Sequence, residues 1–562
     1  MPSHVISKPL PLAFLVALCV VGPATTLSAQ ATPAPTTFYV DAVNGSDSAD
    51  GTTENSAWQT LSRIRRQVLT PGDRVLLRRG GDWATGREQL LIANDSSFNV
   101  DAFDPANPTI NAPPAPAKYG SAEHPIEINA YGEGENPKVF WLGIHRIPHL
   151  TMRNIAVTAR VAGTEYPAKV HNNRNILIED CTITGMLTMD SHNVVLRRVG
   201  FCDNAIEHGL YLNHGSRAFL IEDCLFARNK THGIQTNGAN MDNILDRRCR
   251  LWDNGKAQYN NPNSHNVTFA NNLFFSRDTL NGVNAMGIQD LDSENRFFNN
   301  VFICVATIAA QNNKVVPACS VRSMMTLKNN VYFVLRHAFE GGDATTVSDH
   351  NAYYAIENPE HLVTYSWGQN FATGWVQRTG NDTHSLFVDP GFVDLDLSKD
   401  PDQWDLHLKP TSPLINAGVD VGLPYLGSAP DIGMYEYGEP TPYQLWAGSF
   451  GLPTDGTGTA GPDADPDSDG LPNLAEYALG GDPTSGGDTI QPTATTTNDH
   501  LQISFRRWRA EVAYVVEVSS DLSTWTPVAY QPVPTGEVQL VVDPSEVAGT
   551  ERRFMRLRFS LP

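Results

Sequence analysis

The chain has 562 residues, a formal net charge of −21, and no basic patch interleaved with aromatic residues. Its length allows two or three domains, and its charge pattern argues against nucleic acid as the main partner. Residues 141–340 depart from the acidic balance, because they hold 20 basic and 16 acidic side chains. This segment indicates either an anionic ligand or charges scattered over solvated faces.

The first 31 residues are predicted to be a secretory signal peptide. Lys8 precedes the apolar run 10–21, and Ala-Gln-Ala at 29–31 offers a cleavage site of small residues. No later stretch is apolar for long enough to cross a membrane. We therefore expect an exported, soluble protein, extracellular or periplasmic, that acts as a monomer.

Residues 38–80 are predicted to form a terminal cap. A strand, a Gly/Asp-rich turn, a short helix at 60–67 and a second strand at 71–80 follow one another. A stacked solenoid needs such a cap, because its first coil would otherwise expose an apolar end and an unpaired strand edge.

A nine-residue pattern recurs in the middle of the chain. Asn-Ile-Leu-Ile-Glu-Asp-Cys-Thr-Ile at 175–183 resembles Ala-Phe-Leu-Ile-Glu-Asp-Cys-Leu-Phe at 218–226, and weaker copies follow. Such a repeat indicates one supersecondary unit stacked on itself. Cys181, Cys224 and Cys249 occupy equivalent places, so they are expected to fill a buried column as small apolar side chains. Disulfides are permitted outside the cell but not required.

A second repeat runs out of phase with the first. It reads Gly-Leu-Tyr-Leu-Asn at 209–213, Gly-Ile-Gln-Thr-Asn at 233–237 and Lys-Ala-Gln-Tyr-Asn at 256–260, with a looser copy at 287–291. Each copy alternates, so each is predicted to be a two-faced strand. Stacked coils of such strands form a parallel β-helix with neighbouring strands about 4.8 Å apart. The predicted outward columns are Gly209/Gly233/Lys256/Gly287, Tyr211/Gln235/Gln258/Gln289 and Asn213/Asn237/Asn260.

This polar face is the candidate active site, because its columns repeat along one direction as the sugars of a polysaccharide do. Cleaving a uronate polymer by β-elimination requires a base for the C5 proton, a cation for the carboxylate and an acid for the leaving oxygen. The predicted base is Lys256, whose amine would lie over the space left by the glycines of its column, where burial beside cations would lower its pKa. Further candidates are Tyr211, His208 and His232 for proton transfer, Arg217 and Lys230 for the carboxylate, and Asn213, Gln235, Asn237, Gln258 and Gln289 for hydroxyl groups.

Each candidate has a structural alternative. Lys256 can be a solvated surface amine, the asparagine columns can be ladders that stabilise turns, and His208 and His232 can be packed turn residues. Glycoside hydrolysis is the rival chemistry and needs paired carboxylates. A glycan-binding or adhesin-like protein without activity is a further possibility. The nearest acids for hydrolysis are Asp203, Glu207, Asp253 and Asp290, and none of them repeats in a column.

Motifs at both ends of the repeat region carry a family resemblance. The chain opens with Tyr-Val-Asp-x-x-x-Gly-Ser-Asp-x-x-Asp-Gly-Thr at 39–52 and closes with Ser-Pro-Leu-Ile-Asn-Ala-Gly at 412–418 and Ala-Pro-Asp-Ile-Gly-Met-Tyr-Glu-Tyr at 429–437. Over residues 38–438 it resembles secreted bacterial right-handed parallel β-helix proteins of the pectate-lyase-like superfamily. That resemblance implies a right-handed parallel β-helix fold. It does not select one reaction, because the superfamily includes lyases, hydrolases, epimerases and proteins without activity. The Asp-Pro-His signature of alginate-type epimerases is absent.

Residues 465–476 read Asp-Pro-Asp-Ser-Asp-Gly-Leu-Pro-Asn-Leu-Ala-Glu, the pattern of an EF-hand-like Ca²⁺ loop. Its oxygen ligands suit calcium, and Gly470 permits the sharp turn. We expect a structural ion here; the alternative is a solvated acidic turn. The predicted ligands are Asp465, Asp467, Asp469, the Leu471 carbonyl, Asn473 and Glu476.

The tail alternates at 501–505, 513–518, 538–542 and 554–559, which predicts a small antiparallel β-sandwich. The sequence therefore predicts an all-β protein, a right-handed parallel β-helix followed by that sandwich. Its predicted function is to bind an acidic, uronate-containing polysaccharide and cleave it by β-elimination. The predicted parts are a signal peptide (1–31), a capped β-helix domain (32–438), a linker with the calcium loop (439–489) and a β-sandwich module (490–562).

Overall fold

The computed structural model describes most of the chain after residue 33. The signal peptide predicted at 1–31, together with Gly287, Gln289 and Asp290, lies outside the described residues. No helix in the described part is long and apolar enough to cross a membrane. The described residues are 34–94, 117–158, 166–238, 241–260, 264–277, 294–305, 307–308, 314–315, 318–321, 324–341, 345–357, 371–453, 456–487, 490–509, 511–530, 532–533, 536, 538–546 and 552–561.

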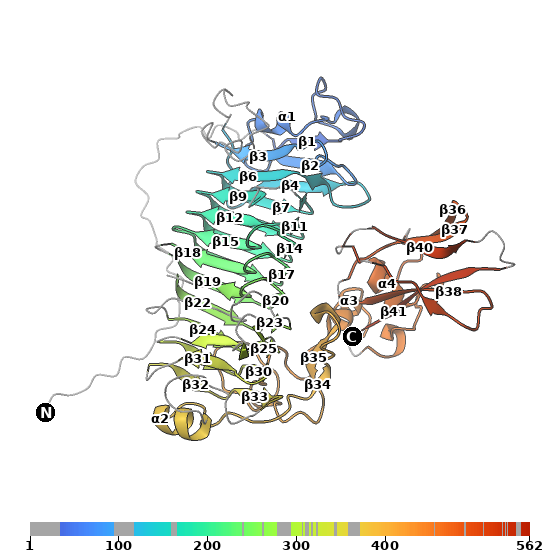
Figure 1. Ribbon diagram of the computed structural model, residues 1–562. Coiled ribbons are helices and arrows are strands. Elements are labelled where there is room, and N and C mark those ends of the chain that lie inside the picture. Colours follow the sequence, from blue (N-terminus) through green and yellow to red (C-terminus); the bar gives the residue numbers. More distant parts are fainter. Residues whose placement is uncertain are drawn as a thin grey trace, which may run out of the picture. The chain divides into compact units, whose positions relative to one another are not determined.

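Most strands belong to three parallel sheets, which the chain visits in turn on successive coils as far as β21; the later described coils continue the first two sheets (Figure 1). Neighbouring coils pair side by side in every sheet, so the predicted parallel β-helix is confirmed. Sheet I comprises β1 (Thr37–Val40), β2 (Arg74–Arg78), β4 (Ile126–Tyr131), β7 (Pro148–Arg153), β10 (Arg174–Glu179), β13 (His192–Arg197), β16 (Arg217–Glu222), β19 (Met241–Arg247), β22 (Ser264–Ala270), β24 (Arg296–Phe298), β29 (Thr326–Lys328) and β32 (Val347–Asp349). Sheet II comprises β5 (Lys138–Val139), β8 (Ala156–Val157), β11 (Thr182–Ile183), β14 (Gly200–Cys202), β17 (Leu225–Ala227), β20 (Arg250–Trp252), β23 (Leu273–Ser276), β25 (Val301–Cys304), β30 (Val331–Val334) and β33 (Ala352–Ala355). Sheet III comprises β3 (Gln89–Ala93), β6 (Trp141–His145), β9 (Ala168–His171), β12 (Met186–Met189), β15 (Leu210–Asn213), β18 (Ile234–Asn237) and β21 (Tyr259–Asn260).

The interior of the coils is filled by columns of like side chains. The rings of Phe274, Phe302, Tyr332 and Tyr353 stack with centroids 4.9, 4.9 and 5.1 Å apart, close to the ~4.8 Å spacing of the strands themselves. The nine-residue repeat therefore supplies the core, because each copy places a large apolar side chain at the same inward position.

The three repeated cysteines lie inside the coils as predicted. Cys181, Cys224 and Cys249 are buried and free. The backbone N–H of Cys224 donates to the Cys249 sulfur at 3.4 Å. They act as small core side chains, and the coils hold together there without a disulfide.

Asparagine ladders fix the bends between strands. The backbone N–H groups of Asn272, Asn300 and Asn330 each donate to the side-chain oxygen of the next asparagine, ending at Asn351, over 2.9–3.0 Å. All four side chains are fully buried. Because buried backbone groups need partners, these ladders hold successive coils in register.

The N-terminal cap has the predicted order of elements. Between β1 and β2 lie a short 3-10 turn, η1 (Glu54–Ser56), and α1 (Ser62–Arg65), which is shorter than the predicted helix at 60–67. Trp58 is almost fully buried, and its ring stacks on Phe38 at 5.0 Å. This packing covers the apolar end of the first coil.

The C-terminal module contains two three-stranded antiparallel sheets, which confirms the predicted β-sandwich. The segment predicted as a linker, 439–489, contains two helices whose Tyr443 and Tyr477 share a core with Ile503 of the sandwich. The domain boundaries themselves stay a prediction. The elements are α3 (Pro442–Ser449), η7 (Gly458–Ala460), α4 (Asn473–Leu479), β36 (Thr493–Thr497), β37 (His500–Arg506), β38 (Ala513–Ser519), β39 (Thr526–Pro527), β40 (Val538–Glu546) and β41 (Phe554–Ser560).

The remaining described elements close the β-helix or project from it. A π-helical turn, η5, leads directly into α2, and one antiparallel strand pair follows. These elements are β26 (Thr307–Ile308), β27 (Lys314–Val315), β28 (Cys319–Val321), β31 (Phe339–Gly341), η5 (Phe371–Val376), α2 (Gln377–Thr379), β34 (Phe392–Asp394), η6 (Pro401–Gln403) and β35 (Asp405–Leu408).

Candidate active site at the edge of sheet III

The first two copies of the second repeat pair as predicted. In β15 and β18, Tyr211 lies beside Gln235 and Asn213 beside Asn237. Leu210 is fully buried, whereas Tyr211 and Asn213 are half-buried. The alternation of the sequence therefore predicted correctly which side chains of β15 face outward.

The third copy is displaced by two residues from the predicted register. Gln235 pairs with Asn260, not with Gln258, and the backbone N–H of Lys256 donates to the Thr231 carbonyl. A second asparagine ladder accompanies this register: Asn204, Asn229 and Asn254 follow one another at intervals of 25 residues, the same interval that separates the paired Ile234 and Tyr259. The predicted place of Lys256 beside Gly233 is therefore wrong, and Gly287, the last member of that predicted column, lies outside the described residues.

The glycines are also not gaps over which an amine could lie. A Cβ atom on Gly209 would meet the Gly233 carbonyl oxygen at 2.9 Å, and one on Gly233 would meet the Gln258 carbonyl oxygen at 2.6 Å. Both distances are too short for non-bonded contact. Glycine is required here because neighbouring coils approach each other closely.

The bends that precede β15 and β18 bring two histidines together. The rings of His208 and His232 stack with centroids 4.9 Å apart and their Nδ1 atoms 3.2 Å apart. Thr231 Oγ1 contacts His208 Nδ1, and Glu207 Oε2 lies 3.5 Å from His208 Nε2. We call Glu207, His208, Tyr211, Thr231 and His232 the histidine cluster.

Local hydrogen bonds define the bend and the tautomer of His208. The Asn204 side chain accepts from the backbone N–H of Glu207 and donates to the carbonyl of His208. The backbone N–H of His232 donates to His208 Nδ1 at 3.3 Å. An acceptor Nδ1 leaves the proton of His208 on Nε2, facing Glu207.

Both imidazoles are neutral at pH 7. Burial, the neighbouring His232 ring and Lys256 lower the pKa of His208 to about 3. Burial and the positive charge of Lys256 lower the pKa of His232 to about 4. Lys256 itself is exposed. The cluster thus contains a largely buried, neutral imidazole pair, and the solvated ammonium group of Lys256 acts on it.

Tyr211 of the cluster and the neighbouring Tyr166 lie against His208. The Tyr211 ring lies edge-on to His208 at 5.3 Å, and Tyr166 lies 5.8 Å from Tyr211 and 6.2 Å from His208. The Asn237 amide donates to the Tyr211 hydroxyl oxygen at 3.2 Å. Because that oxygen already accepts a hydrogen bond, its own proton can be donated elsewhere.

Several predicted residues do not join the cluster. Arg217 starts β16 in sheet I, where its guanidinium donates to His192 Nδ1. Gln258 is almost fully buried and bonds to Asn254 and Ser276, so its predicted outward position is wrong.

Two other predicted residues lie near the cluster without a shown role in it. Gln235 is buried and accepts from the Asn260 amide. Lys230 is exposed in the bend, next to Thr231.

Sequence reasoning did not assign Tyr166 and Thr231 to the site. The sequence did contain a signal for Thr231, because Glu-His-Gly at 207–209 and Thr-His-Gly at 231–233 form a short repeat around the two histidines. Tyr166 comes from an earlier coil with no matching motif, and only stacking of the coils brings it near Tyr211.

The residues of the predicted calcium loop fit a calcium ion. Oxygen atoms of Asp465, Asp467 and Asp469 lie within 4.8 Å of one another. Buried oxygens of Asp465, Asp467 and Asn473 make no hydrogen bond to described residues. Glu476 is fully buried at the twelfth position of the loop. Such an oxygen-only set, with buried carboxylates, is the donor chemistry that Ca²⁺ prefers.

Comparisons with known proteins give partial likenesses. No family model matches the chain. A lacto-N-biosidase of Bifidobacterium longum subsp. longum is 31% identical over 113 residues, which are 20% of this chain and 6% of that protein. The chain thus matches only a small part of the length of that curated relative.

Two solved structures illustrate the structural likeness. A GH136 lacto-N-biosidase from Eubacterium ramulus has 14% identity and a TM-score of 0.34 over 57% of this chain and 64% of its own. The pectate lyase Pel9A has 15% identity and a TM-score of 0.36 over 71% of this chain and 96% of its own.

Proposed function

We propose that the protein is an exported carbohydrate-active enzyme that binds an acidic, uronate-containing polysaccharide and cleaves it by β-elimination at the histidine cluster. The observation that carries this proposal is the neutral His208–His232 pair beside Tyr211 and under the charge of Lys256. These groups supply the base, the acid and the cation that β-elimination requires.

The reaction assigns one step to each group. The lone pair of His232 Nε2 takes the C5 proton, the C5–H electron pair forms the C4–C5 double bond, and the C4–O bond breaks. The Tyr211 hydroxyl, held by Asn237, gives its proton to the leaving oxygen. Lys256 neutralises the uronate carboxylate and thereby the negative charge that develops at C5.

Substrate binding would also strengthen the base. In the free protein, burial and Lys256 keep the pKa of His232 near 4, which makes the imidazole a weak base. A bound carboxylate offsets the charge of Lys256 and adds a negative neighbour, and both effects raise the pKa of a histidine. The base is thus expected to strengthen when an anionic sugar is in place.

Glycoside hydrolysis is the second candidate, favoured by the 31% identity with part of a lacto-N-biosidase. It requires two carboxyl groups about 5–10 Å apart. Among the described residues, the contacts of the histidine cluster include one carboxylate, that of Glu207. Asp203 is paired with Arg228 at 2.8 Å. The described contacts of the cluster thus supply the groups for β-elimination but only one of the two carboxyl groups that hydrolysis requires.

The direct test is a panel of purified polysaccharides, both uronate-containing and neutral. β-elimination produces an unsaturated uronide with ultraviolet absorbance, whereas hydrolysis produces new reducing ends without it. We expect absorbance with at least one uronate polymer and none with neutral glycans. Reducing ends alone would establish hydrolysis, and binding without products would establish a glycan-binding protein.

The site assignment is tested by matched histidine variants. His232→Gln is expected to lower kcat at least 100-fold, the lower end of what general base catalysis contributes. His124→Gln, at an exposed turn, is the control and should retain wild-type activity. Equal activity of the two variants would refute the histidine cluster as the reaction centre.

We further propose that residues 465–476 bind one structural Ca²⁺ ion. The buried loop oxygens and the fully buried Glu476 support this. Calcium would order the segment around α3 and α4. Chelation is therefore expected to expose residues 440–485 to protease, and Glu476→Gln should do so even with calcium present. Unchanged cleavage after chelation would argue against the ion.

A further inference from the structure

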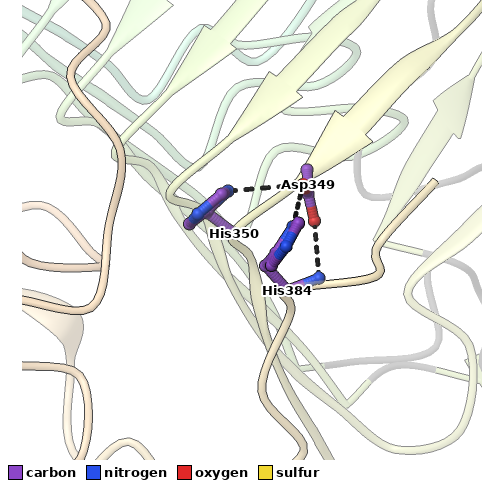
Figure 2. Close-up of side chains that lie close together, drawn as sticks. All are labelled: Asp349, His350 and His384. Carbon is purple, nitrogen blue, oxygen red and sulfur yellow. Dashed lines mark hydrogen bonds and ion pairs between the residues drawn. The ribbon is translucent and has the colours of Figure 1, made fainter.

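A second cluster of reactive side chains lies at the last coil of sheet I. Asp349 ends β32, His350 follows it, and His384 comes from the closing segment after α2. Both histidines present a ring nitrogen to the same carboxylate (Figure 2). Asp349 Oδ2 lies 2.8 Å from His384 Nδ1 and 3.4 Å from His350 Nδ1.

The arrangement leaves one polar atom unexplained. His350 Nδ1 is buried and makes no hydrogen bond to any described residue, although the carboxylate lies 3.4 Å away. The imidazoles of His350 and His384 stack with centroids 5.0 Å apart. The Asp349 carboxylate therefore satisfies His384, while His350 Nδ1 lies within ion-pair distance of the same oxygen without a hydrogen bond to it.

The bend itself does not require a histidine. His350 has a φ of 54°, and the equivalent bends of the three preceding coils hold Asn271, Asn299 and Asn329 with φ values of 55°, 56° and 57°. Asparagine tolerates this left-handed conformation readily. The bend at the last coil thus holds a histidine, a metal-binding group, where the conformation of the backbone does not require one.

We propose that Asp349, His350 and His384 bind one divalent cation of the Zn²⁺ type. One atom from each side chain lies within 4.8 Å of the others. Ligands about 2.0–2.1 Å from a tetrahedral ion lie about 3.3 Å from one another, and the observed separations of 2.8 and 3.4 Å are close to that value. To bind one ion, the two stacked rings would turn so that both Nδ1 lone pairs point at it.

The donor set selects the kind of ion. Two imidazoles and one carboxylate suit zinc, cobalt or nickel, whereas calcium and magnesium prefer oxygen alone. Binding requires the Nδ1 lone pair of both rings, so each bound imidazole carries its proton on Nε2. The side chain of His384 is 66% exposed, and an ion can reach it from solvent.

The ion would join two separate parts of the fold. The backbone N–H of His384 already donates to Asp349 Oδ1 at 2.8 Å, so the closing segment is held against β32 before any ion binds. A metal bridge would replace one hydrogen bond by three coordinate bonds. This site is separate from the histidine cluster, and the inference does not depend on the proposed reaction.

The test uses the full chain, stripped with chelator and saturated with Ca²⁺ so that the loop at 465–476 does not compete. Co²⁺ is titrated while its visible absorption is recorded, and Zn²⁺ is then added as a competitor. The variants are His350→Gln, His384→Gln and, as a matched control, His124→Gln. Circular dichroism confirms that each variant is folded.

We expect one equivalent of Co²⁺ in the wild type and in His124→Gln, with an imidazole-type spectrum that Zn²⁺ abolishes. His350→Gln and His384→Gln should each weaken binding at least about tenfold, the lower end of the loss seen when only an outer partner of a ligand is altered. No Co²⁺ binding by the wild type, or wild-type affinity in either ligand variant, would overturn the proposal.

Discussion

Replacing Asp246 with asparagine is expected to remove a pH dependence of stability that the native chain carries. Asp246 lies in β19 and points into the coil, in a column between Ile221 and Phe269. It is fully buried, and neither carboxylate oxygen makes a hydrogen bond to described residues. The hydroxyl of nearby Tyr259 is likewise buried without one.

The size of the effect follows from the pKa of the buried group. Burial raises the pKa of Asp246 from 3.8 to about 7, and a contact with Cys249 opposes this only in part. The folded chain therefore keeps a proton that the unfolded chain has lost, so stability falls as pH rises from about 4 to about 7. A shift of roughly 3 units at about 1.4 kcal/mol each corresponds to about 4 kcal/mol.

Urea denaturation of the wild type and Asp246→Asn at pH 4 and pH 8 measures this difference. The variant should gain about 4 kcal/mol relative to the wild type between the two pH values, because its side chain does not ionise. Asp420→Asn, in an exposed turn, is the control and should track the wild type. A constant gap between Asp246→Asn and the wild type would refute the raised pKa.

Three further outcomes are expected. Glu222→Gln should lower the free energy of unfolding by about 2 kcal/mol at pH 7, as expected for a lost hydrogen bond to a charged group. Glu222 bonds to three arginines, which lower its pKa to about 2. Its contribution is therefore present above about pH 4.5 and should disappear toward pH 2 in thermal melts recorded in acid. Gly233→Ala should destabilise the folded protein by about 1–3 kcal/mol, because its Cβ would lie 2.6 Å from a carbonyl oxygen. The control is Gly200→Ala, whose Cβ would lie 3.8 Å from its nearest neighbour and should leave the stability in the same urea titration almost unchanged. Calcium added to chelated protein should raise the melting temperature of the C-terminal module, and Glu476→Gln should abolish that increase in calorimetry.

Much of the β-helix was predictable because its signals are local and repeated. Strand alternation and recurrence of the pattern at 175–183 and 218–226 fix which side chains face inward, and each coil confirms the next. The same logic placed Cys224 and Cys249 in the core. The N-terminal cap was predictable because the first coil of a stacked β-helix needs a segment that covers its apolar end.

The registers of single coils were harder to predict, because the alignment of similar side chains implied a different coil length from the one observed. Aligning Lys256 with Gly233 preserved the similarity of the strands, but the ladder of Asn229 and Asn254 sets a coil of 25 residues. A buried ladder of hydrogen bonds outweighs a chance likeness among exposed residues. The cluster of Asp349 and His384 was equally hidden, because 35 residues separate its partners.

The displaced register is what places the amine at the histidines. In the predicted alignment, Lys256 would stand beside Gly233, at the place that Gln258 occupies in the observed coil. In the observed coil it stacks on Thr231, whose hydroxyl contacts both Glu207 and His208. The ammonium group therefore acts on the imidazole pair from the bend and not from the strand face.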